Sequence, residues 1–192
     1  MEPFDIAIIG AGPCGIAAGA AARQSGLKPL LFDKGCVAAS IVGYPYYMRF
    51  FSTADRLEIA GIPWAIPNKN PSRQEALVYY RRVAEHFRLD VRQYEEVESV
   101  SGAEGRFLLR TRQMSGRENE YQARWVVMAT GGFHAPNMLE VPGEELPKVL
   151  HHFKEPYPFY DQDVLVVGGS NSAVEASLEL FRKGIDIDGL LQ

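Results

Sequence analysis

Hydrophobic positions along the chain fall into short apolar runs and one helical stripe, and together they predict an α/β protein. Nearly continuous apolar runs at 4–9 and 28–33 are typical of strands buried on both faces of a parallel sheet. An Ala-rich helix is expected between them at 17–25, with Gly26 as its stop. A strand, a helix and a strand in this order form a βαβ unit, so the two strands should be parallel.

The stripe of apolar residues with helical spacing lies between 72 and 87. Ser72, followed three residues later by Glu75, has the pattern of a capping box at the start of a helix. Six side chains recur at i, i+3 and i+4 and are expected to face a core: Ala76, Leu77, Tyr80, Val83, Ala84 and Phe87.

Four strand-like segments follow this helix. Their residues are 89–94, 95–100, 106–112 and 120–130. Short turns at 101–105 and 115–116 separate the last three segments, which predicts an antiparallel meander. The sheet should therefore combine parallel strands with this meander.

A second strand, glycine turn and helix follow an irregular connection at 136–158. The strand is expected at 164–167, and Gly184 marks the end of the helix. The closing segment "IDIDGLLQ" carries two aspartates where an apolar strand belongs, so no further strand is expected there. We therefore predict a Rossmann-like domain at 1–150 and the incomplete beginning of a second domain of the same kind at 160–192.

The composition is that of an ordinary globular protein, with 46% hydrophobic and 23% charged residues. A formal net charge of −4, without a basic run, argues against nucleic-acid binding. No apolar stretch approaches the roughly 20 residues of a membrane-spanning helix, and the acidic N-terminus is unlike a signal peptide. We therefore expect no membrane partner and a cytoplasmic location. The adjacent residues His151 and His152 would point apart on a helix, so no metal site is predicted.

Gly10, Gly12 and Gly15 form G-x-G-x-x-G between the first strand and its helix. The first glycine permits a tight turn, the second lets the backbone approach a pyrophosphate, and the third lets helix and strand pack closely. The N-terminus of the helix favours negative charge. Asp33 ends the second strand, where an acid is expected to bind a ribose hydroxyl. An acid at this position favours a ribose without a 2′-phosphate, as in FAD or NAD.

The second glycine turn is a candidate site for NAD(P)H. Ser170 replaces the middle glycine and Ala173 the last, so a plain turn between strand and helix is the alternative interpretation. The candidate contacts are Gly168, Gly169, Ser170, Asn171, Ser172 and Ala173.

Several longer segments resemble the bacillithiol-disulfide reductase family, a branch of the thioredoxin-reductase-like flavoproteins. The similarity runs from about residue 4 to about residue 185 and rests on "GAGPCG", "FFSTADRLEIAG", "EALVYYRRV", "ATGG", "LPKVLHHFKE" and "DQDVLVVGGSNSAVEASLEL". It implies an enzyme that takes hydride from NADPH or NADH through FAD and reduces a low-molecular-weight disulfide. The resemblance makes the domain at 1–150 a Rossmann-like FAD-binding domain and the segment at 160–192 the incomplete beginning of a Rossmann-like NAD(P)H-binding domain. It also implies a homo-oligomer and a much longer chain, so this sequence looks truncated at its C-terminus.

The same resemblance extends the predicted cofactor sites. The FAD contacts are then Gly10, Gly12, Pro13, Gly15, Asp33, Lys34, Ser52, Val97, Thr130 and Gly131. Glu175 joins the second glycine turn as an acid near the nicotinamide, and its alternative interpretation is a solvated residue of the helix. The aromatic segment at 44–53, which carries the hydroxyls of Ser52 and Thr53, would flank the flavin or the substrate unless its rings belong to the core.

Cys14 is the candidate catalytic residue. It lies in the first turn of a helix, where the dipole and free N–H groups would stabilise a thiolate, although a neighbouring diphosphate would oppose that effect. Related flavoproteins often carry a small residue here, so a purely steric role is the alternative. The family keeps a cysteine at this position and lacks a CxxC pair. This sequence shares both properties. Cys36 is interpreted as structural.

Two other functions stay open. A flavin monooxygenase shares the two glycine turns, but its F-x-G-x-x-x-H motif is absent, because Gly143 precedes His151 at the wrong distance. A fragment that binds FAD without turnover is the third hypothesis, and the missing C-terminal half favours it.

Overall fold

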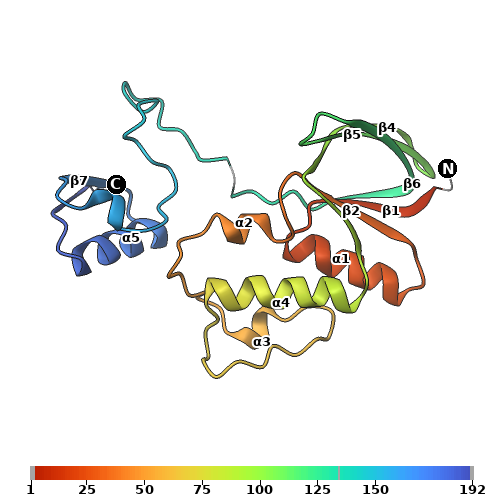
Figure 1. Cartoon of the computed structure of the whole chain (residues 1–192), viewed down its shortest axis with the longest axis horizontal. Coiled ribbons are helices and arrows are strands. Elements are labelled where there is room, and N and C mark those ends of the chain that lie inside the picture. The colour runs from red at the N-terminus through yellow and green to blue at the C-terminus, as the bar shows by residue number, and fades with distance from the viewer. Residues whose placement is uncertain (1–2, 134, 191–192) are drawn as a thin grey trace. The chain divides into compact units, whose positions relative to one another are not determined.

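The computed structural model describes residues 3–133 and 135–190, which form two compact units (Figure 1). The larger unit spans residues 1–43 and 49–137, and the smaller one spans 44–48 and 138–192. The chain therefore leaves the larger unit twice. The predicted domain limits, 1–150 and 160–192, stay a prediction.

The larger unit contains a six-stranded mixed sheet in the order β3-β2-β1-β6-β5-β4. Strand β1 pairs in parallel with β2 and β6, whereas β4, β5 and β6 are antiparallel neighbours. The predicted parallel sheet with a meander is thus confirmed. The strand bounds are β1 Phe4–Ile9, β2 Pro29–Asp33, β3 Asp90–Gln93, β4 Glu95–Ala103, β5 Arg106–Gln113 and β6 Glu118–Met128.

The register of the parallel strands places three strand ends at one edge of the sheet. Ile9, the last residue of β1, pairs with Phe32 near the end of β2 and with Met128 at the end of β6. The loops that follow these strands therefore leave from the same edge, where ligands bind in open α/β sheets.

Two layers of apolar side chains cover the two faces of the parallel strands. On one face, helix α1 (Pro13–Gln24) packs over a cluster around Ile8, Ala11 and Leu31. On the other, the meander curls over Leu30 and Phe32, and Tyr121 of β6 meets the Phe32 ring edge-on at 5.0 Å. Figure 1 shows α1 and α4 on one side of the parallel strands β1 and β2, and β4 and β5 of the meander on the other side.

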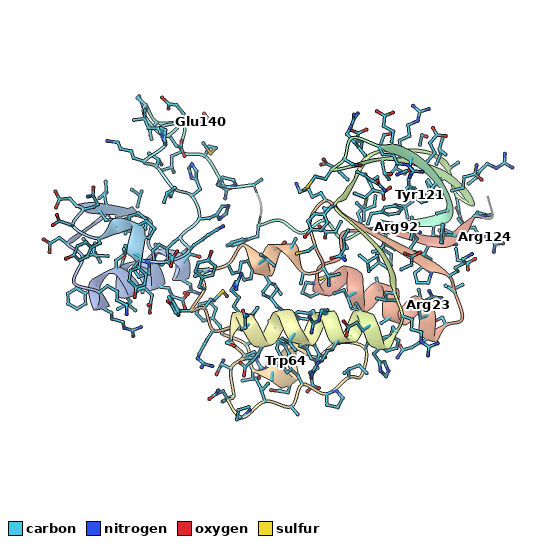
Figure 2. All side chains as sticks on the ribbon, in the orientation of Figure 1. Arg23, Trp64, Arg92, Tyr121, Arg124 and Glu140 are labelled. Carbon is cyan, nitrogen blue, oxygen red and sulfur yellow. The ribbon has the colours of Figure 1, made fainter. Side chains whose placement is uncertain are left out.

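Helix α4 (Arg73–His86) starts with the predicted capping box, in which Ser72 and Glu75 bond reciprocally. Four of the six predicted core side chains are buried, whereas Leu77 and Phe87 are only half-buried. Tyr79, which was not predicted to face the core, is buried instead. Its ring stacks at 4.2 Å on Trp64, which lies beneath α4 in Figure 2.

The segment between β2 and α4 contains two single-turn helices, α2 (Ala39–Val42) and α3 (Ala54–Leu57). The alternative that its aromatic residues form part of the core is wrong for Tyr46, Tyr47 and Phe51, which are 47%, 63% and 61% exposed. The segment connects elements at the surface, so a core was not available to these rings.

The smaller unit is built on β7 (Val164–Val167), α5 (Asn171–Arg182) and β8 (Ile187–Leu190), preceded by the short helix η1 (Tyr157–Phe159). The prediction that no strand follows Gly184 is wrong, because β8 pairs in parallel with β7. Main-chain groups make this pairing, so an aspartate at position 188 can take part in it. The connection through α5 brings β8 beside β7 and overrides the weak strand propensity of the segment.

Candidate functional site

The first glycine turn is folded so tightly that two of its glycines cannot be replaced without a clash. Gly10 has φ +109°, and a Cβ there would lie 2.1 Å from the carbonyl oxygen of Ala129, in the loop after β6. A Cβ on Gly15 would lie 1.9 Å from the carbonyl oxygen of Gly10. The turn therefore brings the N-terminus of α1 against the end of β1 and the loop that follows β6.

Gly12, by contrast, faces open space. It is the N-cap of α1, and a Cβ added to it would meet no atom within 4 Å. No side chain caps this helix, and Pro13 at the first helical position has no N–H. The free N–H groups and the dipole of the first turn thus point at a cradle that suits a phosphate.

Asp33 ties the glycine turn to the end of β2. Its Oδ2 accepts a 2.8 Å hydrogen bond from the N–H of Ala11, and its Oδ1 accepts one of 2.8 Å from the N–H of Gly35. An ionised carboxylate has about four acceptor positions, so a ribose hydroxyl can still be bound. Lys34 follows and is exposed.

The loop after β6 joins the same edge of the sheet. The N–H of Ala129 donates to the carbonyl oxygen of Ile9, and Thr130 and Gly131 follow it in exposed positions. Val97 lies apart from them in β4, where its side chain packs against the core cluster of Leu30 and Phe32. A cofactor contact at Val97 would therefore have to use its main chain.

Cys14 is exposed in the first turn of α1, directly beside the phosphate cradle, whereas Cys36 is half-buried in the turn after β2. The exposed Cys14 thus lies two residues after Gly12, the N-cap of α1. An exposed position allows a thiol to meet a disulfide in solution, which a buried one would prevent.

Ser52 lies in the segment between β2 and α4. It lines a hollow of about 500 Å³ together with Phe51, Thr53, Asp55, Arg56 and Lys69. The hollow belongs wholly to the larger unit. Sequence reasoning missed Asn70, whose side chain holds the wall of this hollow, and the signal available was only an Asn-Pro pair in an irregular segment.

The second glycine turn repeats the backbone of the first. Gly168 has φ +125°, and Ser170 is an extended N-cap of α5 without a capping side chain, like Gly12. The spacing is wider, because a Cβ on Gly168 would lie 3.6 Å from the Cβ of Ala173. This extra room explains why alanine is tolerated where the first turn requires glycine. Glu175 is half-buried in the following turn of α5.

Other kinds of site find no support in the described part of the chain. Within residues 3–133 and 135–190, no three His, Cys, Asp or Glu side chains gather closely enough to hold a metal ion. His151 lies 3.8 Å from the carboxylate of Glu144, which also accepts hydrogen bonds from the N–H groups of Leu139 and Glu140. None of the helices in these residues is both long and apolar enough to cross a bilayer.

Comparison with known proteins agrees with this geometry. The model of a family described as pyridine nucleotide-disulphide oxidoreductase matches residues 7–191. Bacilliredoxin reductase Bdr of Bacillus subtilis (strain 168) is 40% identical over 178 residues, which cover 92% of this chain and 53% of that protein. The probable indole-3-pyruvate monooxygenase YUCCA1 of Arabidopsis thaliana is 32% identical over 186 residues, covering 91% of this chain and 44% of that protein.

Solved structures give the same grouping. Bacillithiol disulfide reductase Bdr (YpdA) from Bacillus cereus is similar with a TM-score of 0.95 at 40% identity, over 99% of this chain and 59% of that one. A flavin-containing monooxygenase from Stenotrophomonas maltophilia has a TM-score of 0.83 at 28% identity, over 100% of this chain and 58% of that one. The resemblance found in the sequence is confirmed, and the chain spans about half the length of the curated relatives it matches.

Proposed function

Because the chain belongs to the pyridine nucleotide-disulphide oxidoreductase family, we propose that it forms the FAD-binding part of an enzyme that reduces a low-molecular-weight disulfide with NADPH or NADH. The family uses flavin and nicotinamide, and the names of the bacillithiol and bacilliredoxin reductases suggest the substrate. The overall reaction would be NAD(P)H + H⁺ + RSSR → NAD(P)⁺ + 2 RSH.

The observation that carries the proposal is the cradle at the start of α1. The open space above Gly12 accepts a diphosphate where any side chain would obstruct it. The acceptor positions left on Asp33 suit the ribose next to it. When bound, a flavin supplies a carrier for two electrons between nicotinamide and disulfide.

Several residues of this chain then act on the bound groups. The uncapped N-terminus of α1 binds the diphosphate and holds it against the sheet edge. Thr130 and Gly131 contact the cofactor from the loop after β6, and the second glycine turn binds NAD(P)H, with Ser170 placing a hydroxyl where the first turn has open space.

Cys14 is the residue that we assign to the disulfide. Its thiolate attacks one sulfur of RSSR, so that a Cys14–S–S–R bond forms while the other half leaves as RS⁻ and takes up a proton. The two electrons and one proton of NAD(P)H, with one further proton from solvent, would then reduce the Cys14–S–S–R bond, so that the second half leaves as RSH and the Cys14 thiol is restored. The exposure of Cys14 beside the cradle supports this role.

The test is an anaerobic titration of the purified chain. We expect a flavin spectrum after reconstitution with FAD, bleaching on addition of NADPH, and recovery of the oxidised spectrum when bacillithiol disulfide or oxidised bacilliredoxin is added. Absence of flavin binding would contradict the proposal. A bound flavin that NADPH does not bleach would indicate the binding fragment, and recovery only with oxygen would indicate a monooxygenase.

Cys14→Ser is the matched variant for this titration, with Cys36→Ser as its control. Serine at position 14 should leave flavin binding and bleaching in place but abolish recovery by the disulfide. Recovery at the normal rate in this variant would remove Cys14 from the mechanism.

A further inference from the structure

The wall of the hollow beside Ser52 is held in place by a short antiparallel pairing of residues 49–54 with residues 69–72, called the clasp below. The N–H of Phe50 donates to the carbonyl oxygen of Pro71 at 2.8 Å, and that of Ala54 donates to the carbonyl oxygen of Lys69 at 3.1 Å. A bridge between Arg49 and Ser72 extends the same pairing. The two irregular segments therefore support one another outside the main sheet.

The side chain of Asn70 stabilises this clasp by hydrogen bonds to the main chain of the facing segment. Its side-chain Nδ2 donates to the carbonyl oxygens of Phe50 at 2.9 Å, Phe51 at 2.9 Å and Ser52 at 3.4 Å. A single amide thus fixes three successive peptide groups. The side chains of Ser52 and Thr53 are held in the wall of the hollow as a consequence.

Two cations in this hollow have no ion-pair partner among the described residues, namely Arg56 and Lys69. The Ser52 hydroxyl likewise makes no hydrogen bond within the described part of the chain. Of the polar groups in the wall, Thr53 is engaged, because its side chain bonds the carboxylate of Asp55.

Asp55 sets the net charge of the hollow. The hydrogen bond from Thr53 lowers the pKa of the Asp55 carboxyl, and the charges of Arg56 and Lys69 lower it further. Asp55 is therefore ionised at neutral pH, and the wall carries one net positive charge.

We propose that this hollow binds a carboxylate group of the disulfide substrate, through Arg56, Lys69 and the hydroxyl of Ser52. The inference rests on the proposed function, which it deepens by naming the residues that bind a carboxylate of the substrate. A guanidinium can bind a carboxylate through two parallel hydrogen bonds, and the ring of Phe51 covers an adjacent apolar part of the ligand.

The charge balance favours a carboxylate over a phosphate. A carboxylate carries one negative charge and matches the single net positive charge of the wall. A phosphate monoester carries about −1.5 to −2 charges near neutral pH, and the ionised Asp55 would repel the excess. The volume of about 500 Å³ is also in the range of small-molecule sites.

The experiment measures binding to the purified chain by NMR titration and does not depend on bound flavin. The probes are glutathione disulfide, which carries carboxylates, and 2-hydroxyethyl disulfide, which is neutral. The variants are Arg56→Gln and Lys69→Gln, with Arg106→Gln as a matched control at the start of β5, where the arginine has no ion pair among the described residues.

We expect each of the two hollow variants to bind glutathione disulfide about tenfold more weakly, which corresponds to about 1.4 kcal/mol. Binding to the Arg106→Gln control and binding of the neutral disulfide should not change. Equal affinity for the two probes, or an equal loss in the control, would overturn the proposal. Circular dichroism of each variant checks that the chain is folded.

Two further arms separate this inference from its alternatives. Adenosine 2′,5′-bisphosphate is the phosphate probe, and a tenfold loss of its binding in Arg56→Gln would assign the hollow to a phosphate instead and refute the carboxylate. Flavin binding and bleaching test the proposed function separately. A chain that bleaches normally but shows no charge-dependent disulfide binding refutes this inference alone, whereas charge-dependent binding in a chain without flavin refutes only the proposed function.

Discussion

The carboxylate of Asp33 accepts a hydrogen bond from the N–H of Ala11, so the end of β2 is tied directly to the glycine turn that follows β1. The other carboxylate oxygen accepts the N–H of Gly35. A residue predicted to contact a ribose therefore also holds its own loop and the neighbouring loop in place. Loss of this side chain should affect both the fold and the cofactor site.

Asp33→Asn tests the two hydrogen bonds that the Asp33 carboxylate accepts. An amide can accept at its oxygen, but its NH₂ group would face one of the two N–H donors, of Ala11 or Gly35. We expect a loss of about 1–3 kcal/mol in the free energy of unfolding and weaker FAD binding. Urea denaturation and flavin titration measure the two effects.

Asp90→Asn is the matched control for this variant. Asp90 lies on the neighbouring strand β3 and makes an exposed ion pair with Arg92 at 3.2 Å, which is worth less than about 1 kcal/mol. An equal loss in the free energy of unfolding for both variants would show that the hydrogen bond from Ala11 to Asp33 does not stabilise the fold more than an exposed ion pair does.

Gly12→Ala should weaken FAD binding with little loss of stability, whereas Gly15→Ala should destabilise the fold itself. The Cβ of an alanine at position 12 meets open space, so we expect a folded chain whose stability falls by less than about 1 kcal/mol and which no longer retains FAD. At position 15 the Cβ would lie 1.9 Å from the carbonyl oxygen of Gly10, so the chain should be strongly destabilised.

Thermal unfolding and flavin content distinguish these two glycine variants. Retention of FAD by Gly12→Ala at wild-type affinity would mean that the open space above α1 is not the diphosphate cradle. A Gly15→Ala variant as stable as the wild type would show that the turn can relax around the added atom.

The glycine turns and the sheet were predictable because each depends on a local pattern. The tight turn at Gly10, the helix after it and the capping box of Ser72 and Glu75 are specified by neighbouring residues. The meander was predictable because its turns lie between alternating segments. Where local chemistry decides the conformation, the sequence is sufficient.

The features that the sequence did not predict share a different cause, because they depend on contacts between distant segments. Asn70 binds an irregular segment about 20 positions away, and no period in the sequence marks either partner. Burial of Tyr79 depends on Trp64, which reaches α4 from the irregular segment. β8 exists because α5 returns the chain beside β7, not because its own residues favour a strand.

Cys14 and Cys36 should differ in reactivity and in their response to FAD. Cys14 is exposed at the cradle and Cys36 is half-buried, so iodoacetamide should modify Cys14 first. Bound FAD should slow the modification of Cys14 several-fold, because its diphosphate would cover part of the first turn of α1 while a disulfide can still reach the thiol, and should have less effect on Cys36. Mass spectrometry of partially alkylated chain measures both rates, with Cys14→Ser and Cys36→Ser to assign them. Equal protection of both thiols would indicate general tightening of the fold rather than a cofactor beside Cys14.

Glu95 is a buried carboxylate whose hydrogen bonds join the three strands of the meander. Its oxygens accept from Thr111, from Gln113 at 3.3 Å and from Asn119 at 3.1 Å. Burial by itself raises the pKa of the Glu95 carboxyl, but the hydrogen bonds from these three residues and Tyr121 outweigh it and the pKa is lowered. Because the folded pKa is below the unfolded value of about 4.3, Glu95 stabilises the fold above that pH.

Glu95→Gln should therefore destabilise the chain at neutral pH and less so in acid. The amide introduced by this substitution would place a donor among four donors, at a cost of about 1–3 kcal/mol in the free energy of unfolding. The contribution of Glu95 in the wild type is lost as the pH falls from about 4.3 through the lower folded pKa, so the two unfolding curves should converge there. Glu104→Gln, at an exposed position in the turn after β4, is the control and should lose less stability at neutral pH than Glu95→Gln. A constant difference between wild type and Glu95→Gln from pH 7 to pH 3, measured by urea denaturation, would show that folding does not lower the pKa of the Glu95 carboxyl.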